Sequence, residues 1–310
     1  MSYNLSLEQP LRTPVLFLIF NRPLTTLRVF NEIRNARPTR LYVAGDGPRL
    51  SHDDEAERVA QARKIATAVD WHCDLKTRFH ESNLGCKEAV SSAISWFFEH
   101  EKQGIILEDD CLPSSSFFWF CENLLNRYEY DNRIMMISGY NKQQTWRQKS
   151  CDYFFSNLGG VWGWASWRRA WTLYDPNMDD LDILIKQKYF DRLLGPRAGP
   201  FRAKQLLKAK SGNISGDISS WAYPWGFSRH KHNGLSCVPC HSLISNIGFG
   251  QNATHTVGLL SDHVVHCDLI PPLRYNDNIE PDFHYDEMFL NVCDRSFPRR
   301  LLRSVRDLIR

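Results

Sequence analysis

Three consecutive carboxylates, Glu108, Asp109 and Asp110, end an apolar run in the segment GIILEDDCLP at residues 104–113. Like charges at the mouth of a buried strand repel one another, and burying them without a partner costs several kcal/mol. Mg²⁺ and Mn²⁺ take oxygen ligands and commonly share carboxylates with substrate phosphates, so a hard divalent cation suits the cluster. Because alternate residues of an extended segment point to one side, Glu108 and Asp110 can face one pocket. A solvated acidic turn or an acidic first helical turn is the alternative.

Polar side chains also follow two other apolar runs. Asn21 and Arg22 come after VLFLIF at 15–20, and Asp46 ends RLYVAGD at 40–46. Around these runs, apolar residues recur with helical spacing. The pattern predicts strands at 15–20, 40–46, 74–79, 104–107 and 133–138, and helices from Pro23, at about 53–69, after a cap at Asn83, and at about 114–128.

Alternating strands and helices predict an α/β fold, with a mostly parallel mixed sheet flanked by helices. In such sheets ligands bind beyond the carboxyl ends of the strands. The three acids, the Asn21-Arg22 pair and Asp46 all fall at such ends, so we expect them to form one site. After about residue 140 the periodicity weakens and the chain becomes rich in Trp, Gly and Asn, which predicts a less regular second part of the same domain.

Composition narrows the class of protein. The 310 residues are 43% hydrophobic and 24% charged, as in ordinary globular proteins, and the net charge is +3. The tail FPRRLLRSVRDLIR carries five Arg and one Asp, so the rest of the chain is about neutral, which argues against nucleic acid as a partner. No apolar run approaches the ~20 residues of a membrane-spanning helix. Nine cysteines without a framework spacing suit a reducing compartment, so we expect a cytoplasmic protein.

The acidic segment also carries a resemblance. GIILEDDCLPSSSFFWFCENLLNRY resembles the Asp-x-Asp region of GT-A glycosyltransferases, in particular the Glu-Asp-Asp form of the N-acetylglucosaminyltransferase I group, and a set of bacterial sugar-nucleotide transferases, some of them called haemolysin-like. The similarity covers most of residues 13–256, with its motifs in the expected order. The other matching stretches are LFLIFNRPLTTLRVFNEI, VAGDGPRLSHDDE, NLGCKEAVSSAISWFF, ISGYN, GWASWRRAW and SWAYPWGFSRHKHNGLSCVPCHSLISNIGFGQNATHT.

The resemblance implies a Rossmann-like GT-A fold and a metal-dependent transfer, with inversion, of a sugar from a nucleotide diphosphate sugar, expected to be a UDP-sugar. The acceptor would be a hydroxyl of a bacterial cell-surface glycan or its lipid-linked precursor. Arg22 and Asp46 would contact the nucleotide, with Asp46 near the base or ribose. Glu108 and Asp109 would contact sugar and ribose hydroxyls, and Asp110 would ligate Mn²⁺ or Mg²⁺ bridging the diphosphate. Such a metal stabilises the charge that grows on the leaving group.

Further candidates come from the second part of the chain. His255, in NATHT, is a second metal candidate by resemblance, and a hydrogen-bonded loop or core histidine is the alternative. Trp164, Trp167 and Trp171 have the i, i+3, i+7 spacing of a helical core stripe. Trp162 and Trp164 have Gly neighbours, so they are also candidates for packing against a sugar ring.

An inverting transfer needs a base for the acceptor hydroxyl, usually a carboxylate. Asp217, in GDISSWAYPW, is our candidate because it precedes an aromatic segment on the expected acceptor side. Better-known members place an acid beside the Trp pair, whereas this chain has Ala222 between Trp221 and Tyr223. The substitutes for Asp217 are Asp152, Asp286 and Glu287, for which a helix cap or a solvated acid is the alternative.

The C-terminal tail has the pattern of a basic amphipathic helix. Leu301, Leu302, Val305, Leu308 and Ile309 fall on one face, and arginines occupy much of the rest. Such a helix can lie on an anionic membrane, as a lipid-linked acceptor would require, or it can pack its apolar face on its own domain.

We therefore expect a nucleotide-sugar-binding half at 1–140, an acceptor-side half of the same domain at 141–260 and an extension at 261–310. One rival function is a sugar-nucleotide hydrolase or nucleotidyltransferase, although nucleotidyltransferases usually begin with a Gly-rich phosphate loop that LFLIFNRPLTT lacks. The other rival is a catalytically inactive protein that binds a nucleotide sugar.

Overall fold

The first half of the chain alternates strands and helices, as predicted. A computed structural model describes residues 10–146, 150–212, 220–248 and 267–292. The first-half elements are β1 (Val15–Ile19), α1 (Pro23–Ala36), β2 (Arg40–Gly45), α2 (Glu55–Ala66), β3 (Asp74–Phe79), α3 (Cys86–His100), β4 (Gln103–Glu108), β5 (Cys111–Pro113), α4 (Ser115–Arg127) and β6 (Ile134–Ser138). The predicted strands and helices of this half are confirmed, but the predicted cap at Asn83 is wrong, because Gly85 holds the N-cap position of α3.

The second half has shorter strands and more connecting chain. Its elements are β7 (Tyr153–Ser156), β8 (Trp164–Trp167), α5 (Arg168–Trp171), α6 (Leu181–Lys186), α7 (Tyr189–Lys210), α8 (Ala222–Lys231), β9 (Leu235–Pro239), β10 (Ile244–Asn246) and α9 (Phe283–Phe289). The tryptophans expected on one helical stripe are indeed buried, but Trp164 and Trp167 belong to a strand and only Trp171 to a helix.

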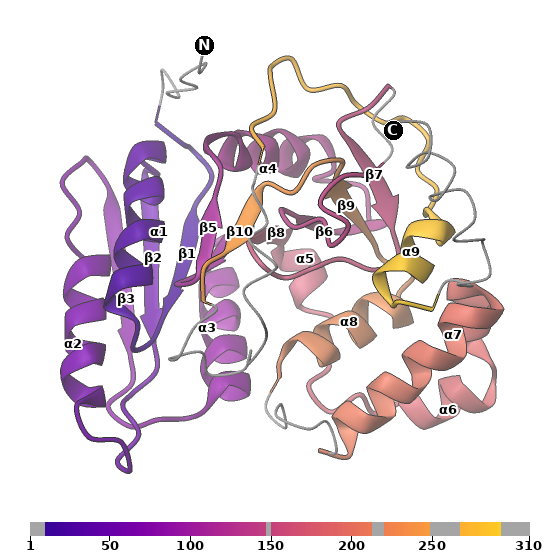
Figure 1. Ribbon diagram of the computed structural model, residues 1–310, viewed down its shortest axis with the longest axis horizontal. Helices are drawn as coiled ribbons and strands as arrows, with labels where there is room; N and C mark the ends of the chain where they lie inside the picture. Colours follow the sequence, from indigo (N-terminus) through magenta and orange to yellow (C-terminus); the bar gives the residue numbers. More distant parts are fainter. Residues whose placement is uncertain (1–9, 147–149, 213–219, 249–266, 293–310) are drawn as a thin grey trace, which may run out of the picture.

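Eight strands form one mixed sheet in the order β3-β2-β1-β4-β8-β6-β9-β7. Neighbours from β3 to β4 are parallel, as are β6 and β9, whereas β8 is antiparallel to both of its neighbours and β7 is antiparallel to β9. In Figure 1 the sheet runs from β3 at the left to β7 at the right, with helices around it. This is the α/β architecture expected of a Rossmann-like GT-A fold. Because β8 lies between β4 and β6, the second half completes the sheet that the first half begins.

Both faces of the sheet are covered, which explains the unbroken apolar run of β1. Val15 and Phe17 face a core built with α1, α2 and α4. Leu16 and Leu18 face the opposite core, which α3 shares with a group of tryptophans from β8, α5 and α8. A strand buried on both faces needs apolar residues at every position rather than at alternate ones.

The strand order also fixes where a ligand can bind. From β1 the chain moves through β2 to β3 on one side and then returns to β4 on the other side of β1. The loops after β1 and β4 therefore diverge, and a crevice opens at the carboxyl ends of these two strands. Arg22 and the acids at 108–110 lie at those ends.

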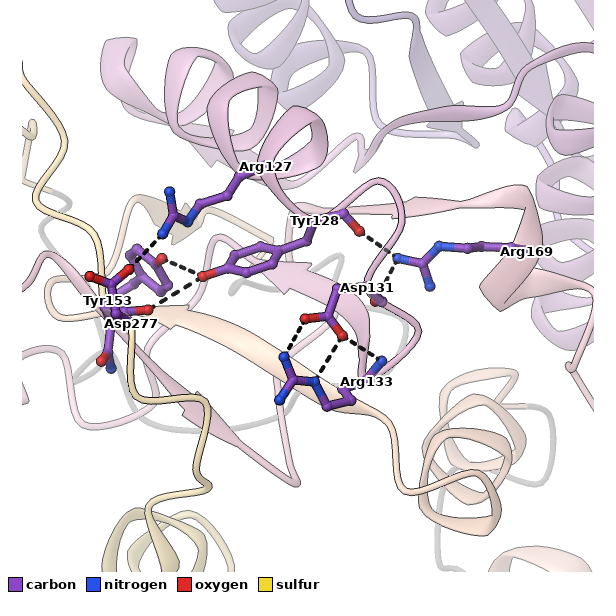
Figure 2. Close-up of polar contacts among 8 residues, drawn as sticks. Arg127, Tyr128, Asp131, Arg133, Tyr153, Arg169 and Asp277 are labelled. Atoms are coloured by element: carbon purple, nitrogen blue, oxygen red, sulfur yellow. Dashed lines mark hydrogen bonds and ion pairs between the residues drawn. The ribbon is translucent and has the colours of Figure 1, made fainter.

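Residues 267–282 cross the end of α4 and the far edge of the sheet. Figure 2 shows Arg127 paired with Asp277 at 2.6 Å, and the hydroxyls of Tyr128 and Tyr153 2.6 Å apart. Arg169 donates to the carbonyl oxygen of Tyr128 at 2.8 Å in the same cluster. The Arg127–Asp277 pair joins the C-terminal part of the described chain to α4, and the other two contacts join the end of α4 to β7 and to α5. Among the helices that the structure describes, none has the length and apolar character needed to span a bilayer.

Candidate functional site

A pocket of about 490 Å³ lies at the carboxyl ends of β1, β2 and β4. It is lined by the loops after those strands, by the N-terminal part of α3 and by residues around Trp162 and Trp221. Of the residues predicted from the sequence, the pocket brings together Arg22, Asp46, Glu108, Asp109, Asp110 and Trp162.

The acidic cluster is organised by one guanidinium group. Arg22 Nη1 lies 2.7 Å from Asp110 Oδ2 and 3.4 Å from Asp109 Oδ1. The backbone N–H of Phe20 donates to Asp109 Oδ2 at 3.0 Å, so the chain that leaves β1 holds the acid that follows β4. Leu18 of β1 is paired with Glu108 of β4, which explains why the two loops start side by side.

Negative charge exceeds positive charge within this cluster. Burial raises the pKa of Glu108 and of Asp109 above the usual range, and the neighbouring carboxylates raise both further, while Arg22 opposes the shift. Burial lowers the pKa of Arg22, but Asp109 and Asp110 outweigh it and raise that pKa. One cation thus faces three carboxylates, and a second cation would stabilise their ionised forms.

The residues around Asp110 suit a hard metal ion. Carboxylate oxygens are the donors that Mg²⁺ and Mn²⁺ prefer. Glu108 receives no hydrogen bond from the described residues, which leaves its oxygens available. A Cβ atom at Gly248 would come within 2.3 Å of Asp110 Oδ2, so glycine keeps the space beside that oxygen open. Within the described ranges no three His, Cys, Asp or Glu side chains converge as a complete ligand set, so the remaining ligands would come from a substrate or from residues outside those ranges.

A buried ion pair braces the pocket wall beside the acids. Glu55 is fully buried and accepts from Arg49 Nη2 at 2.5 Å, from the Arg49 backbone N–H at 2.7 Å and from Asn21 Nδ2 at 2.7 Å. The Arg49 guanidinium lies 5.6 Å from the centre of the Phe20 ring. The loop after β2 is thereby fixed against the loop after β1, and Arg49 faces the pocket.

Asp46 shapes the loop that leads into α3. Its Oδ1 accepts from the backbone N–H groups of Gly47 and Leu84, both at 2.8 Å. Its Oδ2 accepts from Gly85 N at 3.0 Å and from Asn83 Nδ2 at 2.9 Å. Both carboxylate oxygens are thus engaged by the protein, and any contact with a nucleotide would share them with these donors.

The two candidate tryptophans lie in different surroundings. Trp162 lines the pocket and packs against Tyr140, with ring centres 4.5 Å apart. Trp164 does not line the pocket; it is 1% exposed and stacks on Trp221 at 5.6 Å. The sequence-based placement of Trp164 in the site is therefore corrected to the core. Gly163, with φ of 59°, turns the chain between the two tryptophans, so they do not continue one strand.

The remaining predictions fall outside the pocket or outside the described residues. Asp217, His255 and the basic tail lie outside the described ranges. The segments that adjoin the first two do reach the site, since Ser220, Ala222 and Asn246 line the pocket. None of the three substitute bases lines it. Asp152 pairs with Arg274 at 2.5 Å, Asp286 is buried and accepts from Ser156 and Asn157, and Glu287 lies 3.9 Å from Arg197.

Several pocket residues were not singled out from the sequence. Arg49 belongs to the stretch VAGDGPRLSHDDE, so its place after the second strand was the available signal. Trp221 was noted only as a neighbour of Ala222. Arg78 and His80, on β3 and just after it, carry no local signal beyond their position at the end of a predicted strand.

The sequence matches no family model and no curated protein. Solved structures that align with the chain include the mannosyltransferase PcManGT from Pyrobaculum calidifontis, in complex with GDP-Man and Mn²⁺, at 14% identity and a TM-score of 0.35, with 53% of this chain and 49% of that chain covered. S. aureus TarS 1-349 aligns at 11% identity and a TM-score of 0.39, with 75% and 59% covered. A UDP-glucose pyrophosphorylase complexed with UDP-glucose aligns at 9% identity and a TM-score of 0.31, with 52% of this chain and 78% of that chain covered.

This chain therefore spans about half the length of PcManGT and about three fifths of TarS 1-349. Alignments this distant do not by themselves indicate a function. The sheet order and the charged groups of the pocket are the features of this chain that bear on its chemistry.

The Glu55 brace generates a pH-dependent prediction. Burial alone would raise the pKa of Glu55, but hydrogen bonds from Arg49 and Asn21 outweigh it and lower the pKa from 4.5 to about 2. The ionised form is therefore favoured in the folded state. Its contribution to the free energy of unfolding is full above pH 4.5 and disappears as the pH falls toward 2. We expect Glu55→Gln to lower that free energy by at most about 3 kcal/mol at pH 7, and by less as the pH approaches 3.

Urea unfolding of wild type and Glu55→Gln between pH 7 and pH 3 measures this difference. Glu57→Gln is the matched control, because Glu57 lies on the same first turn of α2 but is exposed and bonds only to Gln61 among the described residues. Its effect should be small at every pH. A Glu55→Gln deficit that stays constant down to pH 3 would show that the Glu55 charge is not what stabilises this wall.

Proposed function

We propose that this protein is a metal-dependent GT-A glycosyltransferase that moves a sugar from a nucleotide diphosphate sugar to a hydroxyl of a cell-surface glycan precursor. The observation that carries the proposal is the acidic cluster at 108–110, which meets Arg22 at the divergent ends of β1 and β4 inside a pocket. The order of motifs along the sequence supports the same assignment. We further propose a uridine-based donor and inversion at the transferred carbon, as the sequence resemblance implies.

Each polar residue of the cluster has a proposed role. Asp110 would hold Mn²⁺ or Mg²⁺, with His255 as a further candidate ligand. When bound, the metal supplies a Lewis acid that offsets the charge growing on the leaving diphosphate. Asp109, fixed by the Phe20 N–H, and Glu108 would accept hydrogen bonds from ribose and sugar hydroxyls. Arg22, which lines the same pocket, would donate charge-assisted hydrogen bonds to the phosphates.

The apolar walls of the pocket suit the rest of the donor. Ala44 of β2 and Ala89 and Ala93 of α3 line the pocket, and their small side chains leave room for a planar base. Asp46 would position the loop beside that base through its bonds to residues 83–85, in addition to or in place of a direct contact. Trp162 also lines the pocket, and its indole would offer an aromatic surface to the C–H face of a sugar.

The acceptor side is proposed from the segments that adjoin the pocket. Asp217 would accept the proton of the attacking hydroxyl, and it precedes Ser220 and Ala222, which line the pocket. A lipid-linked acceptor at the inner face of the plasma membrane would be met by a cytoplasmic protein whose basic tail, residues 297–310, contacts anionic lipid. Co-sedimentation of the full chain with anionic vesicles tests the proposed membrane contact of the tail. Failure to bind these vesicles would contradict that contact.

One alternative function has an observation in its favour. Ala222 lines the pocket at a position where resembling transferases carry an acid, so the protein could bind a nucleotide sugar without turning it over. A sugar-nucleotide hydrolase would instead release free sugar without any acceptor. Donor consumption measured with and without a glycan acceptor separates these functions from transfer, since only a transferase requires the acceptor.

Asp110→Ala should remove the activity. Without the carboxylate the metal would lose a protein ligand and the leaving diphosphate its stabilisation, so we expect transfer to fall at least about 100-fold. The measurement is release of nucleoside diphosphate from the donor in the presence of acceptor and Mn²⁺. The matched control is Asp277→Ala, which removes an exposed carboxylate from the far side of the sheet and should leave transfer unchanged. Full, metal-dependent transfer by Asp110→Ala would contradict the proposed site.

Asp217→Asn separates chemistry from binding. The amide keeps the shape of the side chain but accepts no proton, so we expect kcat to fall by about 10² to 10⁴. The affinity for nucleoside diphosphate with Mn²⁺ should stay at the wild-type value, as calorimetry would measure. If kcat is unchanged, the base lies elsewhere in the chain.

A further inference from the structure

In the free protein Arg22 occupies part of the coordination space that a metal would need. Its Nη1 lies 2.7 Å from Asp110 Oδ2, and the same oxygen borders the space kept open by Gly248. A guanidinium and a divalent cation held side by side on one carboxylate repel each other, because each lies only a few ångströms from the other in a partly buried site. Arg22 and a bound metal would therefore compete for Asp110.

The two ends of Arg22 are held very differently. Its backbone caps the start of α1, where the carbonyl oxygen accepts from Thr26 N at 3.0 Å and from Thr26 Oγ1 at 2.8 Å. The long side chain carries the guanidinium away from this anchor, with 19% of its surface exposed. The anchor is compatible with movement of the guanidinium alone, because a change of rotamer leaves the cap intact.

The two acids also differ in how they are held. Asp109 accepts a hydrogen bond from the Phe20 N–H at 3.0 Å, a contact that does not depend on Arg22. Asp110 is contacted by Arg22 and by the Cys111 thiol at 3.4 Å, a weak donor. Arg22 can thus leave Asp110 while it stays near Asp109. The guanidinium would then point into the pocket, where a diphosphate is a better partner than the carboxylate it gave up.

We propose that Arg22 is an internal counter-ion of the metal site, which the donor diphosphate draws away from Asp110 so that metal and nucleotide bind cooperatively. The inference rests on the proposed function and adds the order of events at that site. A metal that binds alone would displace Arg22 from Asp110 and leave the guanidinium without a new anionic partner. A metal that binds with a diphosphate would let Arg22 pair with the phosphates instead. By linkage, each ligand raises the affinity for the other by the same factor, which for such couplings is roughly 5- to 150-fold.

Arg22→Met tests the proposal because it removes the guanidinium and keeps most of the apolar stem. Mn²⁺ alone should bind this variant on the order of tenfold more tightly than it binds wild type. The measurement is the electron paramagnetic resonance signal of free Mn²⁺. Mn²⁺ with UDP, followed by calorimetry, should bind more weakly, because the diphosphate loses a donor. A purely structural role of Arg22 would instead weaken both.

Arg78→Met is the matched control. Arg78 also lines the pocket, but its Nη1 donates to the carbonyl oxygen of Ser92, and no ion pair joins it to a carboxylate among the described residues. The Arg78→Met substitution removes the same charge as Arg22→Met. It therefore measures how much Mn²⁺ affinity rises merely because the pocket loses a positive charge. We expect that gain to be much smaller than for Arg22→Met. If Arg22→Met does not fold, Arg22→Gln provides the same comparison with a neutral side chain that can still donate to Asp110.

The outcomes separate this inference from the proposed function. If Arg22→Met and Arg22→Gln bind free Mn²⁺ no more tightly than Arg78→Met does, Arg22 is not a competing counter-ion, although the site can still be a metal–nucleotide site. If wild type binds Mn²⁺ neither alone nor with any nucleoside diphosphate, the proposed function fails and this inference fails with it. Tighter Mn²⁺ binding together with weaker binding of Mn²⁺ and UDP in the Arg22 variants supports it.

Discussion

The balance of charge at the ends of β1 and β4 is the constraint on which the rest of the site depends. The guanidinium of Arg22 pairs with Asp109 and Asp110, and Glu108 adds a third carboxylate beside them. The Phe20 N–H holds Asp109 in place. A purely structural site would gain nothing from this excess of acid, because burial and mutual repulsion raise the pKa of Glu108 and Asp109. Under the proposed function, a divalent cation would neutralise the acids and Arg22 would pair with the phosphates of the donor.

The sheet brings these groups together without placing them near one another in the sequence. Arg22 and Asp110 are 88 positions apart, yet β1 and β4 are neighbours, so the loops that follow them start side by side. Two further contacts shape the pocket from the β2 side: Glu55 fixes Arg49, and Asp46 fixes the loop into α3. Buried carboxylates thus have two roles in one pocket. Those satisfied by several donors build its walls, and those left short of donors are available to a ligand.

Much of the first half could be predicted from the sequence because its signals are local. Apolar runs predicted the strands. The polar residues that follow those runs, which are Arg22, Asp46 and the acids at 108–110, were therefore predicted at the carboxyl ends of the strands. Errors arose where distant contacts decide. Asn83 bonds to Asp46 instead of capping α3, and the turn at Gly163 sends Trp164 into the core against Trp221, just before α8, which no spacing rule anticipates. The charged start of α2 gave no sign that Glu55 would be buried in a brace. Asp217 and His255 remain predictions.

The most direct test of the central claim is the thermal unfolding of the wild-type protein with nucleoside diphosphates and nucleotide sugars, each with Mn²⁺, with Mg²⁺ and with a chelator. A ligand at 100 times its dissociation constant stabilises the folded state by about 2.7 kcal/mol, which is readily measured. The account predicts stabilisation by one nucleotide family, and only when metal is present. If no nucleotide stabilises the protein with either metal, the acids at 108–110 form no metal–nucleotide site and the account is wrong.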